Sequence, residues 1–367
     1  MEADEEGFFY PKINDELCIL CGGCKSVCPI FNKIINNQDF EQKIFAVKHR
    51  SEEVRALSTS GGMFTALSDY ILDNEGIVYG AVLDQGFRVV HIRATTKESR
   101  NRMRGSKYVQ SNMDKIYSLI QSDLKAGKRV LFTGTPCQAA GLKGYLNDVN
   151  THNLILCDFI CHGVPSHLLW QQYINFVNKK RKAKLKSHYF RIKNQGWHNM
   201  CSKNVFYNGK EDYKSMLSQL HMNLFLSDYL LRPCCYNCKF SSYHRCTDIT
   251  IADFWGIERT EPDFDDNKGV SLVLINSLKG SDLFEKVRGV LEIRQSKASD
   301  CLQGNLQVPA PIPKDRDTFW KDFHTKGYGF IVKKYCRYNL FTRFKQYSVH
   351  KIKGIKSTVN DKKDLMH

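Results

Sequence analysis

The chain has 367 residues, of which 42% are hydrophobic, and it carries a formal net charge of +16. This length suits one large domain or two medium ones, and fourteen cysteines are too few for a disulfide scaffold of this size. The acidic start of the chain lacks the apolar segment of a signal peptide, and no apolar stretch is long enough to cross a bilayer. We therefore expect a cytoplasmic protein, in a reducing environment, whose thiols bind metal.

The first cysteines follow a C-x2-C-x2-C-x3-C-P spacing and are Cys18, Cys21, Cys24 and Cys28. Short loops of this kind hold cubane iron–sulfur clusters, and Gly22 and Gly23 allow the tight backbone curvature that such a loop needs. A zinc site more often has two C-x2-C pairs with a longer spacer. Either Cys28 completes the first cluster or a distant cysteine replaces it, and we adopt the first, simpler option.

Positive charge is concentrated in the stretch 179–186 and in a tail from Lys333 to Lys363, where aromatic residues are interleaved. Such charge suits nucleic acid, an anionic membrane surface, an acidic electron carrier or a phosphorylated substrate. No nucleic-acid-binding module accompanies it, so we expect no specific nucleic acid. A solvated surface is the simpler interpretation, and docking of an acidic ferredoxin is the more economical functional one.

The next segments predict alternating helices and strands. A helix is expected over 63–72, after the Ser/Gly-rich stretch 58–62, and Ser58 or Ser60 can cap it. Free N–H groups at such a helix start favour an anion. Strands are expected over 77–83 and 89–94, and a helix over 113–126.

Two later segments repeat one layout: a buried strand, a cysteine at its end and a helix. Cys137 follows the strand predicted over 129–134, and Cys161 follows the one over 154–159. We expect an α/β fold with a mainly parallel mixed sheet flanked by helices, since strands alternate with helices. The remaining predictions are strands at 188–193 and 204–207, helices at 166–180 and 216–231, paired core strands at 248–256 and 270–276, and mixed helix and loop over 281–330.

A second group of cysteines can supply one more cluster. Cys137 and Cys161 at two strand ends, with the C-x2-C pair Cys235 and Cys238, give four thiols. The alternative is that Cys137 and Cys161 are ordinary buried cysteines. We expect Cys157 to belong to the core.

Several motifs together resemble the coenzyme F-420 hydrogenase/dehydrogenase beta-subunit protein family, over roughly residues 45–290. They are Ser58–Gly62 with its helix, Arg104–Tyr108, Thr133–Gln138, Cys161–Ser166, and Arg232–Cys238 followed by Asp248–Gly256. The departure from the family pattern is Cys234, which leaves open whether Cys234 or Cys235 is the ligand.

The resemblance implies an iron–sulfur flavoprotein with FAD beside a 4Fe-4S cluster. It assigns Cys137, Cys161, Cys235 and Cys238 to that cluster, so that the chain would hold two 4Fe-4S clusters in all. It assigns FAD contacts to Ser60, Gly61, Gly62, Arg104, Gly105, Ser106, Lys107, Tyr108, Thr133, Gly134 and Thr135. His162, next to a ligand, would tune its potential or move a proton, or only cap a turn, and Asp253 would be an acid near the flavin or a turn residue.

The expected function is transfer of electrons from a ferredoxin-type donor through both clusters and FAD to a small-molecule acceptor. That acceptor is a deazaflavin or another small molecule, in some relatives linked to surface-polysaccharide synthesis. The alternative is an electron-transfer subunit without a substrate site of its own, serving a partner enzyme. We expect a ferredoxin-like module over 1–40, a catalytic core over 41–330 and a basic tail over 331–367. Peripheral membrane contact through that tail and homo-oligomer formation are further expectations.

Overall fold

The computed structural model describes residues 1–31, 40–147 and 149–338. The chain divides into two compact units, each assembled from separate segments. The first unit contains Met1–His167, Phe190–Cys201 and Leu231–Pro311, and the second contains Leu168–Tyr189, Ser202–Leu230 and Ile312–His367. Most of the predicted basic tail lies outside the described residues.

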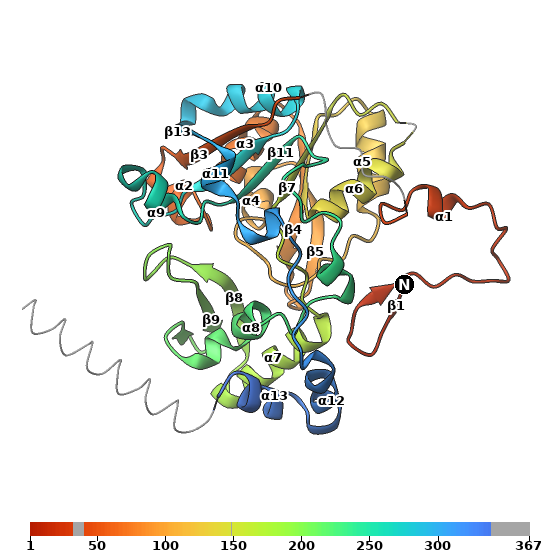
Figure 1. The fold of residues 1–367 in the computed structure, drawn as a ribbon, viewed down its shortest axis with the longest axis vertical. Helices are drawn as coiled ribbons and strands as arrows, with labels where there is room; N and C mark the ends of the chain where they lie inside the picture. Colours follow the sequence, from red (N-terminus) through yellow and green to blue (C-terminus); the bar gives the residue numbers. More distant parts are fainter. Residues whose placement is uncertain (32–39, 148, 339–367) are drawn as a thin grey trace, which may run out of the picture. The chain divides into compact units, whose positions relative to one another are not determined.

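The first unit is built on an eight-stranded sheet with the order β13-β3-β12-β11-β7-β6-β4-β5. In chain order its strands are β3 (Lys43–His49), β4 (Ile77–Leu83), β5 (Val89–Ala94), β6 (Val130–Gly134), β7 (Leu154–Phe159), β11 (Ile249–Asp253), β12 (Ser271–Ile275) and β13 (Leu291–Ser296). Helices flank this mixed sheet, which confirms the α/β fold class (Figure 1).

Strand direction decides which loops meet at one edge of this sheet. The central strands β4, β6, β7 and β11 are parallel to one another. Strand β11 pairs with β12, as predicted, and the pairing is antiparallel. Strand β3 is antiparallel to β12 and so points the same way as the central four. The carboxyl ends of β3, β4, β6, β7 and β11 therefore lie at a common edge, where α/β sheets build their sites.

Both faces of the sheet are buried, because successive strand side chains point to opposite faces. In β6, Leu131 packs into the cluster formed with α3 (Met63–Asp73) and α10 (Leu278–Val287), while Val130 and Phe132 pack into another. This second cluster includes side chains from α5 (Ile116–Lys125) and α6 (Pro136–Tyr145). Such central strands read as nearly continuous apolar runs in the sequence, which made them easy to predict.

Shorter elements complete the first unit. They are β1 (Glu2–Ala3), β2 (Phe9–Tyr10), α1 (Gly23–Ser26), α2 (Glu52–Ala56), α4 (Lys97–Asn101), η1 (Pro233–Asn237), α9 (Ile257–Thr260), η2 (Pro262–Phe264), η3 (Arg288–Val290), α11 (Ala298–Cys301) and η4 (Gly304–Leu306). Among the residues described, no helix is long and apolar enough to span a membrane.

The second unit combines helices with a three-stranded sheet of order β10-β9-β8, and β8 continues into the first unit. Its elements are α7 (His167–Arg181), β8 (Leu185–Ile192), β9 (Cys201–Phe206), β10 (Glu211–Asp212), α8 (Met216–Leu226), α12 (Arg316–Lys326) and α13 (Tyr328–Tyr335). Inside it, Trp170 stacks on Tyr173, whose hydroxyl donates to the Ser218 carbonyl at 3.2 Å.

Three local predictions need correction. Helix α3 begins after Gly62 without a side-chain cap, because the Ser58 hydroxyl donates to the Val54 carbonyl and the Ser60 hydroxyl to the Val270 carbonyl. The predicted helix over 216–231 ends at Leu226, before Asp228 adopts a left-handed φ of 65°. Strand β13 lies in the stretch 281–330 that was predicted as mixed helix and loop, and strand β3 was not predicted at all.

Gly61 occupies a position where only glycine fits, because a Cβ there would lie 2.2 Å from the Val47 carbonyl oxygen and 2.6 Å from the Ser271 nitrogen. We expect Gly61→Ala to lower the free energy of unfolding by about 3 kcal/mol, since backbone atoms must move to admit the methyl group. Gly289→Ala is the matched control, because no atom lies within 4 Å of its added Cβ. Urea unfolding measures both variants, and an unchanged midpoint for Gly61→Ala would contradict the packing described here.

Candidate functional site

The cysteines predicted at strand ends lie at the common carboxyl edge of the sheet. Cys137 is in the first turn of α6, directly after β6, and Cys161 follows the neighbouring parallel strand β7. Thr135 caps α6 in a capping box with Gln138, which fixes the start of the helix. The Thr135 hydroxyl lies 3.1 Å from the Cys137 sulfur.

Electrostatic interactions between the thiols show that the second group of cysteines gathers in space. Loss of hydration raises the pKa of Cys161 to about 12, and the nearby thiols of Cys137 and Cys238 contribute to this shift. Desolvation also raises the pKa of Cys137, and Cys238 and Cys234 add to that effect. The raised pKa favours the neutral thiol of Cys137 and of Cys161 until a cation is bound, as expected of metal ligands.

Cys234 and Cys235 interact with each other as well as with this group. The Cys235 thiol donates to Cys234, and this bond raises the pKa of Cys235 while it lowers that of Cys234. The positive charge of Arg232 also lowers the pKa of Cys234, and Cys161 raises that of Cys235. Both residues therefore stay candidates for the fourth ligand.

A buried ion pair holds the chain segments that carry these thiols. Arg245 donates to the Asp158 carboxylate at 2.8 Å, and the two side chains are 1% and 0% exposed. The other Asp158 oxygen accepts from the Thr250 hydroxyl at 2.6 Å. Arg245 also donates to the backbone carbonyls of Phe240 and Phe159, at 3.1 Å each. The end of β7, which leads to Cys161, is thereby tied to the segment that follows Cys238.

The first cysteine run contacts the same region of the first unit. Cys18, Cys21 and Cys24 are exposed, Cys28 is half-buried, and the Ile30 carbonyl accepts from the Lys239 ammonium at 2.8 Å. Upstream, the guanidinium of Arg232 lies 4.0 Å from the centre of the Tyr10 ring. Arg232 and Lys239 bracket the segment that carries Cys234, Cys235 and Cys238, so the two cysteine groups belong to neighbouring segments.

Two of the cysteines that belong to neither group are buried among hydrophobic side chains. Cys157 is 1% exposed and belongs to the main hydrophobic cluster, which confirms its prediction as a core residue. Cys246 is also buried, and it packs against Phe240 and Ala140 in a small cluster.

The glycine-rich loop lies at the same edge of the sheet. The Gly61 carbonyl accepts from the His49 nitrogen at 2.7 Å, and its nitrogen donates to the Ser271 hydroxyl at 2.9 Å. Gly62 then has φ of 98° and precedes α3, which starts without a side-chain cap. A helix start of this kind leaves backbone N–H groups available to an anion.

The segment containing Arg104, Gly105 and Ser106 contacts this loop. The Ser106 nitrogen donates to the Thr59 hydroxyl at 3.0 Å, and Gly105 has φ of 80°. The Arg104 Nε is buried and has no hydrogen-bond partner within the described part of the chain. Desolvation lowers the pKa of Arg104, and the neighbouring Arg100 lowers it further. An anionic group here would satisfy that guanidinium.

Other residues predicted to contact the cofactor make internal bonds. The Lys107 ammonium donates to the carbonyls of Met103 and Arg104, at 2.6 and 2.9 Å. Burial lowers its pKa to about 7. The Thr133 hydroxyl donates to the Tyr79 carbonyl at 2.9 Å. Through its side chain, Lys107 therefore holds the end of the preceding turn.

Asp253 and His162, the predicted catalytic residues, both have side-chain partners. Asp253 accepts from Arg191 at 3.1 Å and from the Trp197 indole at 2.7 Å. His162 Nδ1 lies 3.0 Å from the Asn305 side-chain oxygen. The contacts of Asp253 join the end of β11 to the end of β8 and to the segment that follows it.

Arg191 and Lys193 were missed by the sequence analysis. Arg191 is hydrogen-bonded to Tyr108 as well as Asp253, and the Lys193 ammonium donates to the carbonyls of Ser60 and Lys268, at 2.7 and 2.6 Å. In the sequence, these two basic residues stand two positions apart at the end of a predicted strand, so their side chains share one face. This pattern is only a weak indication of a functional role. Both contact residues predicted to bind the cofactor.

An α/β sheet with a glycine loop and a group of thiols at its carboxyl edge is the arrangement that the motifs implied. Comparison with protein families agrees with it. The coenzyme F420 hydrogenase/dehydrogenase beta-subunit models match residues 44–117 for the N-terminal part and 127–299 for the C-terminal part. The chain therefore belongs to this family, whose members are parts of oxidoreductases.

Individual relatives are distant. One component of the F(420)H(2) dehydrogenase of Methanosarcina mazei is 22% identical over 149 residues, and the match spans 40% of this chain and less than half, 41%, of that protein. A chain of the F420-reducing [NiFe] hydrogenase complex of Methanosarcina barkeri has 19% identity and a TM-score of 0.46, and the match covers 69% of this chain and 81% of that one.

We expect Lys193→Met to loosen the glycine loop, because the carbonyls of Arg55, Ser60 and Lys268 each lose a donor. The free energy of unfolding should fall by about 2 kcal/mol. Burial lowers the pKa of Lys193 to about 7, so the unfolded chain binds more protons between pH 7 and 10.5 and stability should rise with pH there. That component should vanish in the variant.

Urea unfolding at several pH values measures this effect as the difference between wild type and variant. Lys97→Met, which removes an exposed ion pair with Asp73, is the control and should change stability little. A Lys193→Met variant as stable as wild type would show that these three bonds do not hold the loop.

Proposed function

We propose that the protein is an iron–sulfur flavoprotein that passes electrons through two 4Fe-4S clusters to FAD. Cys18, Cys21, Cys24 and Cys28 would hold the first cluster. The second would be held by Cys137, Cys161, Cys238 and either Cys235 or Cys234. The observation that carries the proposal is the meeting of Cys137, Cys161 and the Cys234–Cys238 segment at the carboxyl edge of one sheet.

The chemistry of this donor set fits an iron–sulfur cluster, because its members are thiols and soft thiolates favour such clusters. A glycine loop at the same edge fits the phosphates of FAD. Gly61 brings the backbone close, the start of α3 has no side-chain cap, and the buried Arg104 Nε lacks a partner among the described residues.

Bound flavin would accept single electrons and release two together. The chain's own residues would orient the flavin and control access to it. Arg191 holds Asp253 at 3.1 Å and contacts Tyr108, so these three form one fixed unit beside the glycine loop. Asp253 would therefore position neighbouring groups, and His162 would shield a cluster ligand or move a proton beside it.

The donor we propose is a ferredoxin-type carrier in the cytoplasm, and the acceptor is a small molecule such as a deazaflavin. The family's description and the name of the curated relative, a dehydrogenase of F420H2, support a deazaflavin as one candidate. They also favour the second candidate function, an electron-transfer subunit that feeds a partner enzyme, because both names describe parts of larger assemblies. Turnover of a deazaflavin by the isolated chain would support the first function, and turnover only after addition of a partner would support the second.

Anaerobically purified protein should contain about eight irons, about eight sulfides and one FAD. Cys161→Ser should lose about four irons, because one cluster loses a ligand from the strand end. Cys336→Ala, in the second unit, is the control and should keep all of them. Separate Cys234→Ser and Cys235→Ser variants identify the fourth ligand as the one whose loss removes iron. Zinc in place of iron would refute the proposal.

Cys21→Ser should abolish reduction of the protein by ferredoxin, while FAD stays bound and dithionite still reduces it. The reason is that Cys21 belongs to the exposed run, whereas the glycine loop lies at the sheet edge. Stopped-flow absorbance of the flavin measures the rate at which ferredoxin reduces it. Cys24→Ser should behave in the same way. Loss of the flavin in these variants would show that the first run supports the flavin site directly.

A further inference from the structure

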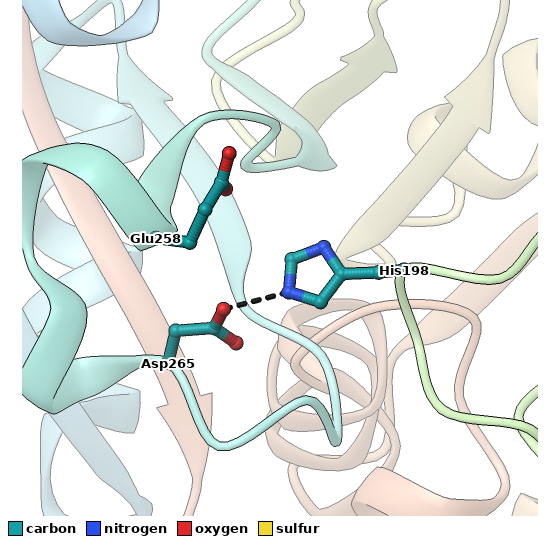
Figure 2. A group of neighbouring side chains, drawn as sticks. All are labelled: His198, Glu258 and Asp265. Carbon is teal, nitrogen blue, oxygen red and sulfur yellow. Dashed lines mark hydrogen bonds and ion pairs between the residues drawn. The ribbon is translucent and has the colours of Figure 1, made fainter.

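Three potential metal ligands meet on the first unit away from the cysteines. They are His198, in the segment after β8, and Glu258 and Asp265, which lie seven residues apart in α9 and directly after η2 (Figure 2). One ligand atom from each lies within 4.8 Å of the other two. His198 Nε2 and an Asp265 carboxylate oxygen are 2.6 Å apart, and the Glu258 side chain lies beside them.

The backbone beneath these side chains is held by the aromatic core. The Trp197 ring stacks on Trp255, with centroids 4.9 Å apart and planes 5° apart. Its backbone nitrogen donates to the Asn267 carbonyl at 2.8 Å. Trp197 is fully buried, and this stack fixes the residue directly before His198 and the one three positions before Glu258.

Asn267 ties the His198 segment to the Asp265 segment. Its side-chain oxygen accepts from the His198 nitrogen at 3.0 Å, and its own nitrogen donates to Asp265 Oδ1 at 2.9 Å. Gly196 is required for this approach, because a Cβ there would lie 2.2 Å from the Asn267 side-chain nitrogen. The ligands are thus mounted on interlocked turns, which lowers the entropic cost of binding an ion.

We propose that His198, Glu258 and Asp265 bind one divalent cation of the kind that prefers oxygen and nitrogen ligands, such as Mn2+. Two carboxylates and a neutral imidazole balance the charge of such an ion. The imidazole favours a first-row transition ion over calcium and magnesium, which take oxygen ligands. Three protein ligands leave positions open for water or for an oxygen atom of another ligand. None of these three residues is among those proposed to hold the clusters or the flavin.

The geometry needs only small movements to accept an ion. Metal bonds of about 2.1 Å place neighbouring ligand atoms about 3.0–3.5 Å apart. The His198–Asp265 contact must open from 2.6 Å by less than about 1 Å, and the ion takes the place of the shared proton. Glu258 can close the remaining gap, since its side chain is 45% exposed and the ion pair that it makes with exposed Arg259 is a long one, at 3.7 Å.

Asp265 gives a physical reason for a cation here. Its side chain is only 9% exposed, whereas that of His198 is 34% exposed. A largely desolvated carboxylate is costly without a compensating charge. A divalent ion bound by this carboxylate would supply that charge.

The test is a titration of the full-length, cofactor-loaded protein with Mn2+. The EPR signal of the free ion measures how much Mn2+ stays unbound at each point. Thiolates bind Mn2+ more weakly than they bind iron or zinc, so the cysteines should not compete with the proposed site for this ion. Wild type should bind one equivalent, and His198→Gln, Glu258→Gln and Asp265→Asn should each weaken binding at least tenfold. Asp263→Asn and His152→Gln, which change exposed residues outside the group, should bind as wild type.

Urea unfolding confirms that each variant is folded, and Glu258→Gln changes an exposed side chain. Equal Mn2+ affinity in wild type and all three variants would overturn the proposal, as would the absence of a bound equivalent in wild type at millimolar Mn2+. In either case the group is an ordinary His–Asp pair beside a surface glutamate.

Discussion

The buried pair of Asp158 and Arg245 determines where the second group of thiols can lie. Burying both charges is expensive, and the pair offsets that cost only because both charged groups are also hydrogen-bonded to other partners. Removing one partner would leave an uncompensated charge, at a cost of about 3–5 kcal/mol. The pair therefore positions chain segments more than it adds net stability. It connects the end of β7 to the segment after Cys238, which keeps Cys161 near the Cys234–Cys238 segment.

The direction of the strands then brings the two proposed cofactor sites to one edge. Strand β3 points the same way as the central parallel strands although it is three places from β7, and Gly61 is hydrogen-bonded to the end of β3 and to the start of β12. The glycine loop and the thiols therefore share an edge without being close in sequence. Asp253 ends β11, which lies between β7 and β12, and its bond to Arg191 connects this edge to the end of β8.

Local sequence patterns predicted the parts of this arrangement that are local in the structure. Strand β4 and strand β5 have the predicted bounds, and both cysteines expected at strand ends are there. Strand β3 was missed because its burial depends on a partner, β12, more than 200 residues away. Arg191, Lys193 and the Asp158–Arg245 pair are long-range contacts, and no periodicity marks them. The discontinuous second unit has no sequence signal either.

The charge around the first cysteine run constrains how the proposed electron donor would approach it. Residues 1–31 carry six acidic and two basic side chains, while the whole chain has a net charge of +16. Leu17, Ile19 and Leu20, beside the first cysteines, are 78%, 85% and 89% exposed. An acidic carrier would be attracted by the rest of the chain over distances up to a Debye length, but its final contact at the run would be apolar. Added salt should therefore slow the encounter more than it weakens the complex once formed.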